Sequence, residues 1–186
     1  MKKTEKQKYK KLMKVSYGAK VKNLPDGLTK DKKLSGKRVT VLTNANHTEN
    51  YVVHRGTASL KDWHTDMHMA LGYEGGNRFK HAKKIQKKAE AKYGAQTITT
   101  VGHSLGGRIA EKYGKKSSKV VTFNKAVTPR SIYESYTKPN KNQMDIRTKN
   151  DPVSSLHKFQ KGDKQRTTTL KGSANPIDTH VLSSLK

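Results

Sequence analysis

Residues 101–107 (VGHSLGG) carry the clearest chemical pattern in the sequence. They contain the pattern G-x-S-x-G, follow a short apolar run and precede residues with helical periodicity. In that context the serine is expected on a tight strand-to-helix turn, a nucleophile elbow, which presents its hydroxyl to a substrate. Gly102 and Gly106 leave room for neighbouring chain segments because neither carries a Cβ atom. We therefore predict Ser104 as a nucleophile, with Gly102, His103 and Gly106 forming the elbow around it.

A serine nucleophile needs a histidine as its base, and an acid must orient that histidine. Where the serine lies on a nucleophile elbow, the chain order is serine, acid, histidine. Only two histidines follow Ser104, namely His157 and His180. His180 comes after the last predicted strand, whereas His157 precedes that strand. We therefore predict His180 as the base.

Several aspartates follow the serine and compete for the role of the acid. Asp151 lies in a loop directly after a predicted strand, the position at which the acid is expected. Asp145 lies inside that strand and Asp163 lies in a basic turn. Asp178 stands only two residues before the predicted base, a separation that rarely lets two side chains face each other. The predicted catalytic residues are Ser104, Asp151 and His180.

The elements that must position these residues follow from the hydrophobic pattern. Strands are expected at 38–43, 50–54, 97–101, 119–124, 144–148 and 166–170. Helices are expected at 59–71, at 78–93, directly after the elbow, and from about residue 176 to the end. Strands that alternate with helices indicate an α/β protein with a largely parallel sheet.

The composition points to an acidic partner. The 186 residues include 40 Lys and Arg but only 14 Asp and Glu, which gives a net charge of +26. Such a surplus favours binding to a polyanion, either nucleic acid or an anionic membrane surface. Cysteine is absent, which excludes disulfides, thiolate metal sites and a cysteine nucleophile. No apolar run is long enough to cross a membrane, and no apolar region follows the basic N-terminus as in a signal peptide, so an intracellular or virion-associated protein is expected.

The chain is expected to contain a basic flexible arm at 1–20 and one folded domain at 21–186. Residues 1–14 hold seven lysines and few apolar residues. Such an arm could tether the protein to nucleic acid or lipid, or it could serve only as a solubilising tail. Turn signals between residues 22 and 37 place the start of the domain after the arm.

Residues 52–66 (VVHRGTASLKDWHTD) combine a strand, a tight Arg-Gly-Thr turn and a helix. This segment resembles the F-R-G-T/S…D-W…D stretch of the fungal-type (class three) lipase family, α/β-hydrolases that cleave acylglycerols and sometimes phospholipids. With the elbow and the Asp-Pro-Val loop at 151–153, the resemblance extends from about 38 to 182. It implies a compact α/β-hydrolase-type fold, with a mostly parallel sheet and helices on both faces.

The resemblance also implies roles for further residues. The backbone amides of Thr57 and Leu105 would form the oxyanion hole. Residues at about 62–77 would lie over the site as a lid, and four apolar side chains there would form a lid or acyl-binding face or else ordinary core: Trp63, Met67, Met69 and Leu71. The sequence departs from the family at His54, where an aromatic or aliphatic residue is usual, and at Arg108, where a small residue is common.

These observations predict a serine carboxylester hydrolase of lipase or phospholipase type that acts on a lipid or small ester. No cofactor is expected and no metal site is expected, because the sequence lacks a phosphate-binding loop, a dinucleotide fingerprint and a zinc-protease motif. The alternative hypothesis is a structural protein that reuses a lipase fold to bind nucleic acid or another polyanion, for example inside a virion.

Overall fold

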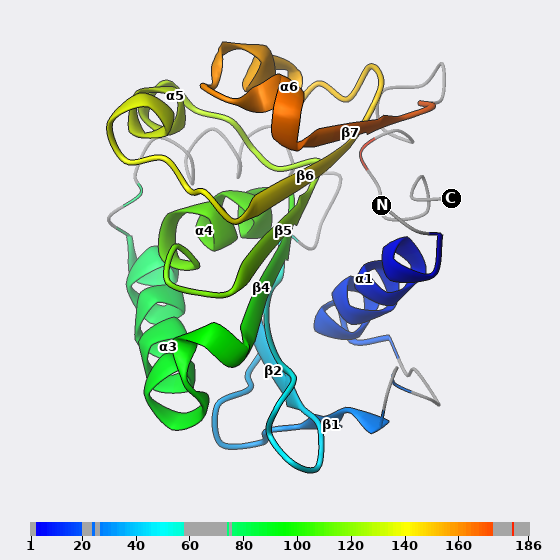
Figure 1. The fold of residues 1–186 in the computed structure, drawn as a ribbon, viewed down its shortest axis with the longest axis vertical. Coiled ribbons are helices and arrows are strands. Elements are labelled where there is room, and N and C mark those ends of the chain that lie inside the picture. Colours follow the sequence, from blue (N-terminus) through cyan, green and yellow to red (C-terminus); the bar gives the residue numbers. More distant parts are fainter. Residues whose placement is uncertain are drawn as a thin grey trace.

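A twisted sheet runs through the middle of the computed structural model, which describes residues 3–19, 24, 27–57, 74, 76–172 and 180 (Figure 1). Within these residues the sheet has seven strands in sequence order: β1 (Thr29–Lys30), β2 (Val39–Thr43), β3 (Asn50–His54), β4 (Ile98–His103), β5 (Lys119–Phe123), β6 (Gln143–Thr148) and β7 (Thr167–Leu170). The pairs β1–β2 and β2–β3 are antiparallel, and β3 to β7 are parallel. The carboxyl ends of the parallel strands therefore meet at one edge of the sheet, where ligand sites of open α/β sheets lie.

Helices cover both faces of this sheet, as predicted. Helix α1 (Lys3–Ser16) lies on one face, whereas α3 (Asn77–Tyr93) and α4 (Leu105–Tyr113) lie on the other (Figure 1). The described residues also include α5 (Pro129–Thr137), α6 (Asp163–Arg166) and the 3-10 helices η2 (Ala95–Thr97) and η3 (Ser155–Phe159). None of these described helices is long and apolar enough to cross a membrane.

The predicted strands and the helices at 78–93 and after the elbow are confirmed, with ends that differ by at most three residues and coincide for β3. The two-residue strand β1 and the helices α5, η3 and α6 were not predicted. Helix α5 has a recognisable local signal, because Thr128 directly precedes Pro129 and forms a reciprocal capping box with Ser131. The predicted helix at 59–71 lies outside the described residues, and of the helix predicted from about residue 176 only His180 is described, with helical backbone.

The flexible arm predicted at 1–20 is wrong for residues 3–16, which form α1 and pack against the sheet. Tyr9, Leu12 and Met13 stand on one face of this helix and are at most 5% exposed. Tyr9 lies three residues before Leu12 and four before Met13, the spacing of an amphipathic helix. The many lysines around them suggest a solvated arm when the segment is judged by its composition. The helix is therefore part of the folded core.

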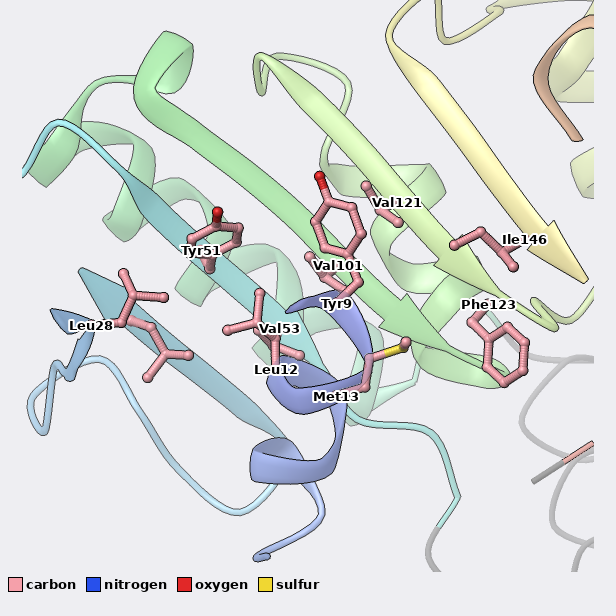
Figure 2. Packing of buried hydrophobic residues seen from close by; sticks show 11 residues of the cluster. Tyr9, Leu12, Met13, Leu28, Tyr51, Val53, Val101, Val121, Phe123 and Ile146 are labelled. Atoms are coloured by element: carbon pink, nitrogen blue, oxygen red, sulfur yellow. The ribbon is translucent and has the colours of Figure 1, made fainter. Parts of the chain in front are cut away.

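The two faces of the sheet carry separate apolar clusters because successive strand residues point to opposite sides. On the α1 side, Figure 2 shows Tyr9, Leu12 and Met13 against side chains that reach across the sheet as far as Phe123 and Ile146. On the α3 side, Val52 packs with Ala89 and Ile98. The central parallel strands are buried on both faces, which explains why their sequences read as short apolar runs rather than as alternating ones.

Candidate active site

Ser104 occupies a strained turn between β4 and α4. Its φ of 56° and ψ of −127° lie outside the regions that non-glycine residues usually adopt. The backbone holds it there: Ser104 N donates to Phe123 O, and Ser104 O accepts from Ala126 N at 3.1 Å. The side chain is buried, and within the described part of the chain its hydroxyl makes no hydrogen bond. Such stored strain in a conformation that the neighbouring segments fix is typical of functional sites.

Two glycines allow the close approach that this turn requires. A Cβ atom on Gly102 would stand 2.2 Å from Gly106 O, and one on Gly106 would stand 2.1 Å from His54 O. Both contacts are with backbone atoms that cannot move aside. Gly102 thus lets the end of β4 lie against the first turn of α4, and Gly106 lets that turn lie against the end of β3.

The predicted acid and the predicted base lie together. His180 Nδ1 is 2.7 Å from Asp151 Oδ1, and both residues are at most 3% exposed. The other carboxylate oxygen, Asp151 Oδ2, accepts a hydrogen bond from Ser154 N at 2.9 Å. Because a carboxylate oxygen accepts, His180 donates from Nδ1 to Asp151, which leaves Nε2 as the ring nitrogen that can take a proton from a nucleophile.

The competing residues are engaged elsewhere. Asp145 binds Lys125 and Arg166, at 2.9 and 3.0 Å. His157 Nδ1 lies 2.8 Å from Asp163 Oδ1, so the second histidine has its own acidic neighbour away from Asp151. Asp178 lies outside the described residues.

His103 connects the elbow to the histidine of that pair. Its Nε2 lies 2.8 Å from His180 O, and its ring stacks on Phe123 with the centroids 5.5 Å apart. A carbonyl can only accept, so His103 carries its proton on Nε2 and offers Nδ1 as an acceptor. Burial and the nearby His180 lower the pKa of His103 to about 3, so the ring is neutral near pH 7.

The acceptor on His103 is used by Tyr17, which follows α1. The Tyr17 hydroxyl lies 2.8 Å from His103 Nδ1 and also accepts a hydrogen bond from Gly56 N at 2.9 Å. One phenol therefore joins the N-terminal helix to the elbow and to the loop that contains Thr57. Burial raises the pKa of Tyr17 to about 12, which keeps the phenol protonated so that it donates to His103.

The two predicted oxyanion residues belong to segments that adjoin the nucleophile. Leu105 is the first residue of α4, so its N–H has no partner within the helix. Thr57 is half-buried and follows Gly56, on which a Cβ atom would stand only 3.0 Å from Ser104 Cβ. The loop of Thr57 thus passes directly beside the serine. The predicted lid or acyl-binding residues lie outside the described part of the chain: Trp63, Met67, Met69 and Leu71.

The two departures from the lipase pattern are buried polar residues. His54 is fully buried and donates from Nε2 to Gln86 Oε1 at 3.2 Å. Its burial lowers its pKa to about 4. Arg108 is also fully buried and binds carboxylates from three segments, Glu74, Glu111 and Glu134. Arg108 therefore fastens α4 to its neighbours rather than lying free beside the elbow.

Two residues of the site were not predicted from the sequence. Tyr17 lies in the segment interpreted as an arm, and no motif marks it. Asn124 follows β5 with a φ of 41°; its side chain donates to Thr148 Oγ1 at 2.7 Å and accepts from Thr148 N at 2.8 Å. Asn124 Nδ2 also donates to His180 O at 3.4 Å. Its signal in the sequence is an asparagine directly after a strand, a position that tolerates a positive φ.

Comparisons with known proteins place this geometry in context. A family model described as phospholipase-like, Tle-like phospholipase domain, matches residues 11–178. The search of curated proteins finds no match.

Solved structures of fungal lipases share the fold. The Lip2 lipase of Yarrowia lipolytica is 17% identical with a TM-score of 0.60, and the match covers 95% of this chain and 82% of that one. A Rhizomucor miehei lipase in a propeptide complex is 15% identical with a TM-score of 0.57, over 82% of this chain and 61% of that one. A lipase of Rhizopus microsporus var. chinensis is 20% identical with a TM-score of 0.53, over 81% and 67%. This chain thus spans about three fifths of the Rhizomucor chain, and at these identities the likeness shows the α/β-hydrolase fold alone.

Proposed function

Since the chain belongs to the family of Tle-like phospholipase domains, we propose that it is a serine carboxylester hydrolase that acts on phospholipid esters. The observation that carries the proposal is the buried pair of Asp151 and His180, with Nδ1 and Oδ1 2.7 Å apart, held against the residue that precedes the strained Ser104. A buried histidine with its orienting carboxylate beside a nucleophile elbow is the arrangement that serine hydrolysis requires.

In this mechanism Ser104 Oγ attacks the ester carbonyl while His180 Nε2 removes the hydroxyl proton. Asp151 keeps the imidazole in the required tautomer and stabilises the positive charge that the ring acquires. The tetrahedral intermediate then collapses, the bond to the alcohol breaks, and His180 returns the proton to the departing alkoxide. A water molecule, deprotonated by His180, hydrolyses the acyl-enzyme and releases the fatty acid and Ser104.

The negative charge on the substrate oxygen would be held by the backbone N–H groups of Thr57 and Leu105. The N–H of Leu105 points out of the first turn of α4, where the helix dipole also favours a negative charge. Each such donor contributes about 3–4 kcal/mol to the stability of the transition state. The hydrogen bond from Gly56 N to the Tyr17 hydroxyl supports this role, because it fixes the peptide between Arg55 and Gly56, directly before the peptide that carries the Thr57 N–H.

The test compares the purified protein with Ser104→Ala, Asp151→Asn and His180→Gln on short-chain esters and on phospholipid vesicles. Matched controls are His157→Gln and Asp145→Asn, which change the competing residues, and circular dichroism verifies that every variant is folded. We expect a loss of at least about 10³-fold in the first three variants, with the controls at the parent level.

Two results would overturn the proposal. Undiminished hydrolysis by Ser104→Ala would exclude this serine as the nucleophile. A folded parent protein without activity on either substrate would favour the alternative, a lipase-fold protein that binds nucleic acid or another polyanion.

A further inference from the structure

The outward face of α3 carries a dense row of lysines. Five of them are exposed and, within the described residues, have no carboxylate partner: Lys80, Lys83, Lys84, Lys87 and Lys88. Other lysines of the chain are neutralised, such as Lys125, which lies buried between Glu111 and Asp145. Exposed lysines without a carboxylate partner among the described residues also occur elsewhere, such as Lys141 and Lys164, but on α3 five of them fall within residues 80–88 of one helix.

This row opposes the stability of the helix itself. Lys80 and Lys84, Lys83 and Lys87, and Lys84 and Lys88 are like charges four residues apart, each pair of which destabilises a helix. The first turn contains no acidic residue and two cations, although the positive end of the helix dipole lies there. The only acid in the helix, Glu90, accepts a hydrogen bond from Gln86.

The buried face of α3 compensates for this repulsion and connects the helix to the candidate site. Phe79 and Ala82 pack in one cluster with Leu105 and Ile109 of α4, the helix that begins at the elbow. At the start of α3, Arg78 Nη2 donates to Arg55 O, two residues before Thr57. The lysine row therefore belongs to a helix that packs against α4, and it begins two residues after the contact of Arg78 with Arg55. Figure 1 shows α3 and α4 on the same face of the sheet.

We propose that this α3 lysine face (residues 80, 83, 84, 87 and 88) is the docking surface for an anionic phospholipid bilayer, an inference that rests on the proposed function. A row of ammonium groups on a straight helix matches the negative headgroups of a membrane surface, with about fivefold in affinity for each lysine close to it. Apart from His81 and Ala91, the exposed positions of α3 are charged or amide side chains, so the helix presents no large apolar side chain that would insert among acyl chains. The helix would thus adsorb to the surface and hold the edge of the active site near its substrate.

The observations favour a bilayer over nucleic acid. Binding to single strands typically uses several aromatic side chains for stacking, and none of the five lysine positions provides one, with His81 the one exposed ring of α3. Reading of base edges also uses asparagine or glutamine for adenine and carboxylates for cytosine, and none of the five side chains of this face is of these types.

Binding is measured in the Ser104→Ala background, so that no substrate is consumed, on vesicles of pure phosphatidylcholine and of equimolar phosphatidylcholine and phosphatidylglycerol. The α3 variant replaces Lys83, Lys84, Lys87 and Lys88 with Gln, a good helix former. The control variant replaces four exposed lysines at the opposite edge of the sheet, on and around β6, α6 and β7, and has the same net charge: Lys141, Lys149, Lys164 and Lys171. Thermal unfolding verifies that both variants are folded.

We expect strong binding only to the anionic vesicles, a loss of at least about 100-fold in the α3 variant and less than about fivefold in the control. Higher salt should release the protein, because exposed charges are screened. An equal loss in both variants, or none in the α3 variant, overturns the proposal. Binding of both variants to duplex DNA is measured as well. If the α3 variant retains vesicle binding but loses binding to DNA, the proposal is overturned and the face is assigned to nucleic acid. Hydrolysis of a water-soluble ester by the protein with Ser104 intact is measured separately, so a failed enzyme assay is distinguished from a failed docking surface.

Discussion

The Tyr17 hydroxyl lies 2.8 Å from His103 Nδ1, and through this contact the N-terminal helix reaches the residue beside the nucleophile. The chain of hydrogen bonds is directional: Gly56 N donates to the Tyr17 oxygen, Tyr17 donates to His103 Nδ1, and His103 Nε2 donates to His180 O. It joins the loop of the predicted oxyanion hole, the elbow and the predicted base. A chain in which every donor and acceptor is satisfied fixes the relative positions of its members.

Removal of the Tyr17 hydroxyl should therefore impair hydrolysis more than binding. In Tyr17→Phe the Gly56 N–H loses its acceptor and His103 loses its donor, while the apolar packing of the ring is retained. We expect kcat to fall by about tenfold with KM nearly unchanged, together with a loss of about 1–2 kcal/mol in the free energy of unfolding. Steady-state kinetics and urea unfolding measure both.

The control for this variant is Tyr9→Phe. Tyr9 lies on α1 and donates to Glu5 at 3.2 Å, away from the elbow. Tyr9→Phe should lower the free energy of unfolding but leave kcat at the level of the parent protein. An equal fall in kcat in both variants would show that Tyr17 acts only through the stability of α1.

The pH dependence of stability should reflect two buried neutral histidines. Burial lowers the pKa of His103 to about 3 and that of His54 to about 4, whereas a histidine in the unfolded chain titrates near 6.5. Between these values the unfolded state binds more protons than the folded state. The stability that these residues contribute is therefore complete above pH 6.5 and is lost as the pH falls towards 4 for His54 and towards 3 for His103.

The slope in that interval should approach about 1.4 kcal/mol per pH unit for each histidine. In His54→Gln, which can still hydrogen-bond Gln86, one of the two contributions disappears and the slope should fall accordingly. Urea unfolding at a series of pH values measures it. Identical slopes for the variant and the parent would contradict the assignment of His54 as a neutral buried group.

Much of the site could be predicted from local sequence, because an elbow depends on a few adjacent residues. Asp151 could be preferred over Asp145 because the order of strand and loop is visible in the hydrophobic pattern. Tyr17 could not be found in this way, since its partners His103 and Gly56 are distant in sequence and the lysines of α1 suggest a solvated arm. Other contacts between residues far apart in the sequence could not be predicted either, because they form only when the chain is packed.

The buried Arg108 is such a contact, and its removal should destabilise the protein severely. Its guanidinium binds both oxygens of Glu74, at 2.8 and 3.0 Å, and also Glu111 and Glu134. In Arg108→Ala the buried carboxylates of Glu74 and Glu111 lose the guanidinium that balances part of their negative charge. We expect a loss of about 3–5 kcal/mol in the free energy of unfolding.

Arg130 offers a matched comparison because it contacts the same carboxylates. It lies 3.2 Å from Glu134 and 3.6 Å from Glu74, but its side chain is 67% exposed. Arg130→Ala should therefore cost less than about 1 kcal/mol. If the two variants were equally stable, the buried network would contribute no more than a surface ion pair.

Helix α1 should behave as part of the core rather than as an appendage. Leu12 is fully buried against the sheet, in the cluster that contains Val53 and Val101 (Figure 2). Leu12→Ala should lower the free energy of unfolding by about 2–5 kcal/mol, because it removes apolar contacts and leaves a cavity. The neighbouring Lys11→Ala, an exposed position on the same helix, should change it by less than about 0.5 kcal/mol.

The same pair of variants separates the structural role of α1 from its role at the site. Leu12→Ala loosens the helix that precedes Tyr17, so hydrolysis should become sensitive to urea concentrations well below those at which the sheet unfolds. Lys11→Ala should lose activity only together with the global unfolding transition. If activity and global unfolding coincide in both variants, the helix and the sheet unfold as one cooperative unit, and Tyr17 remains in place until the whole domain opens.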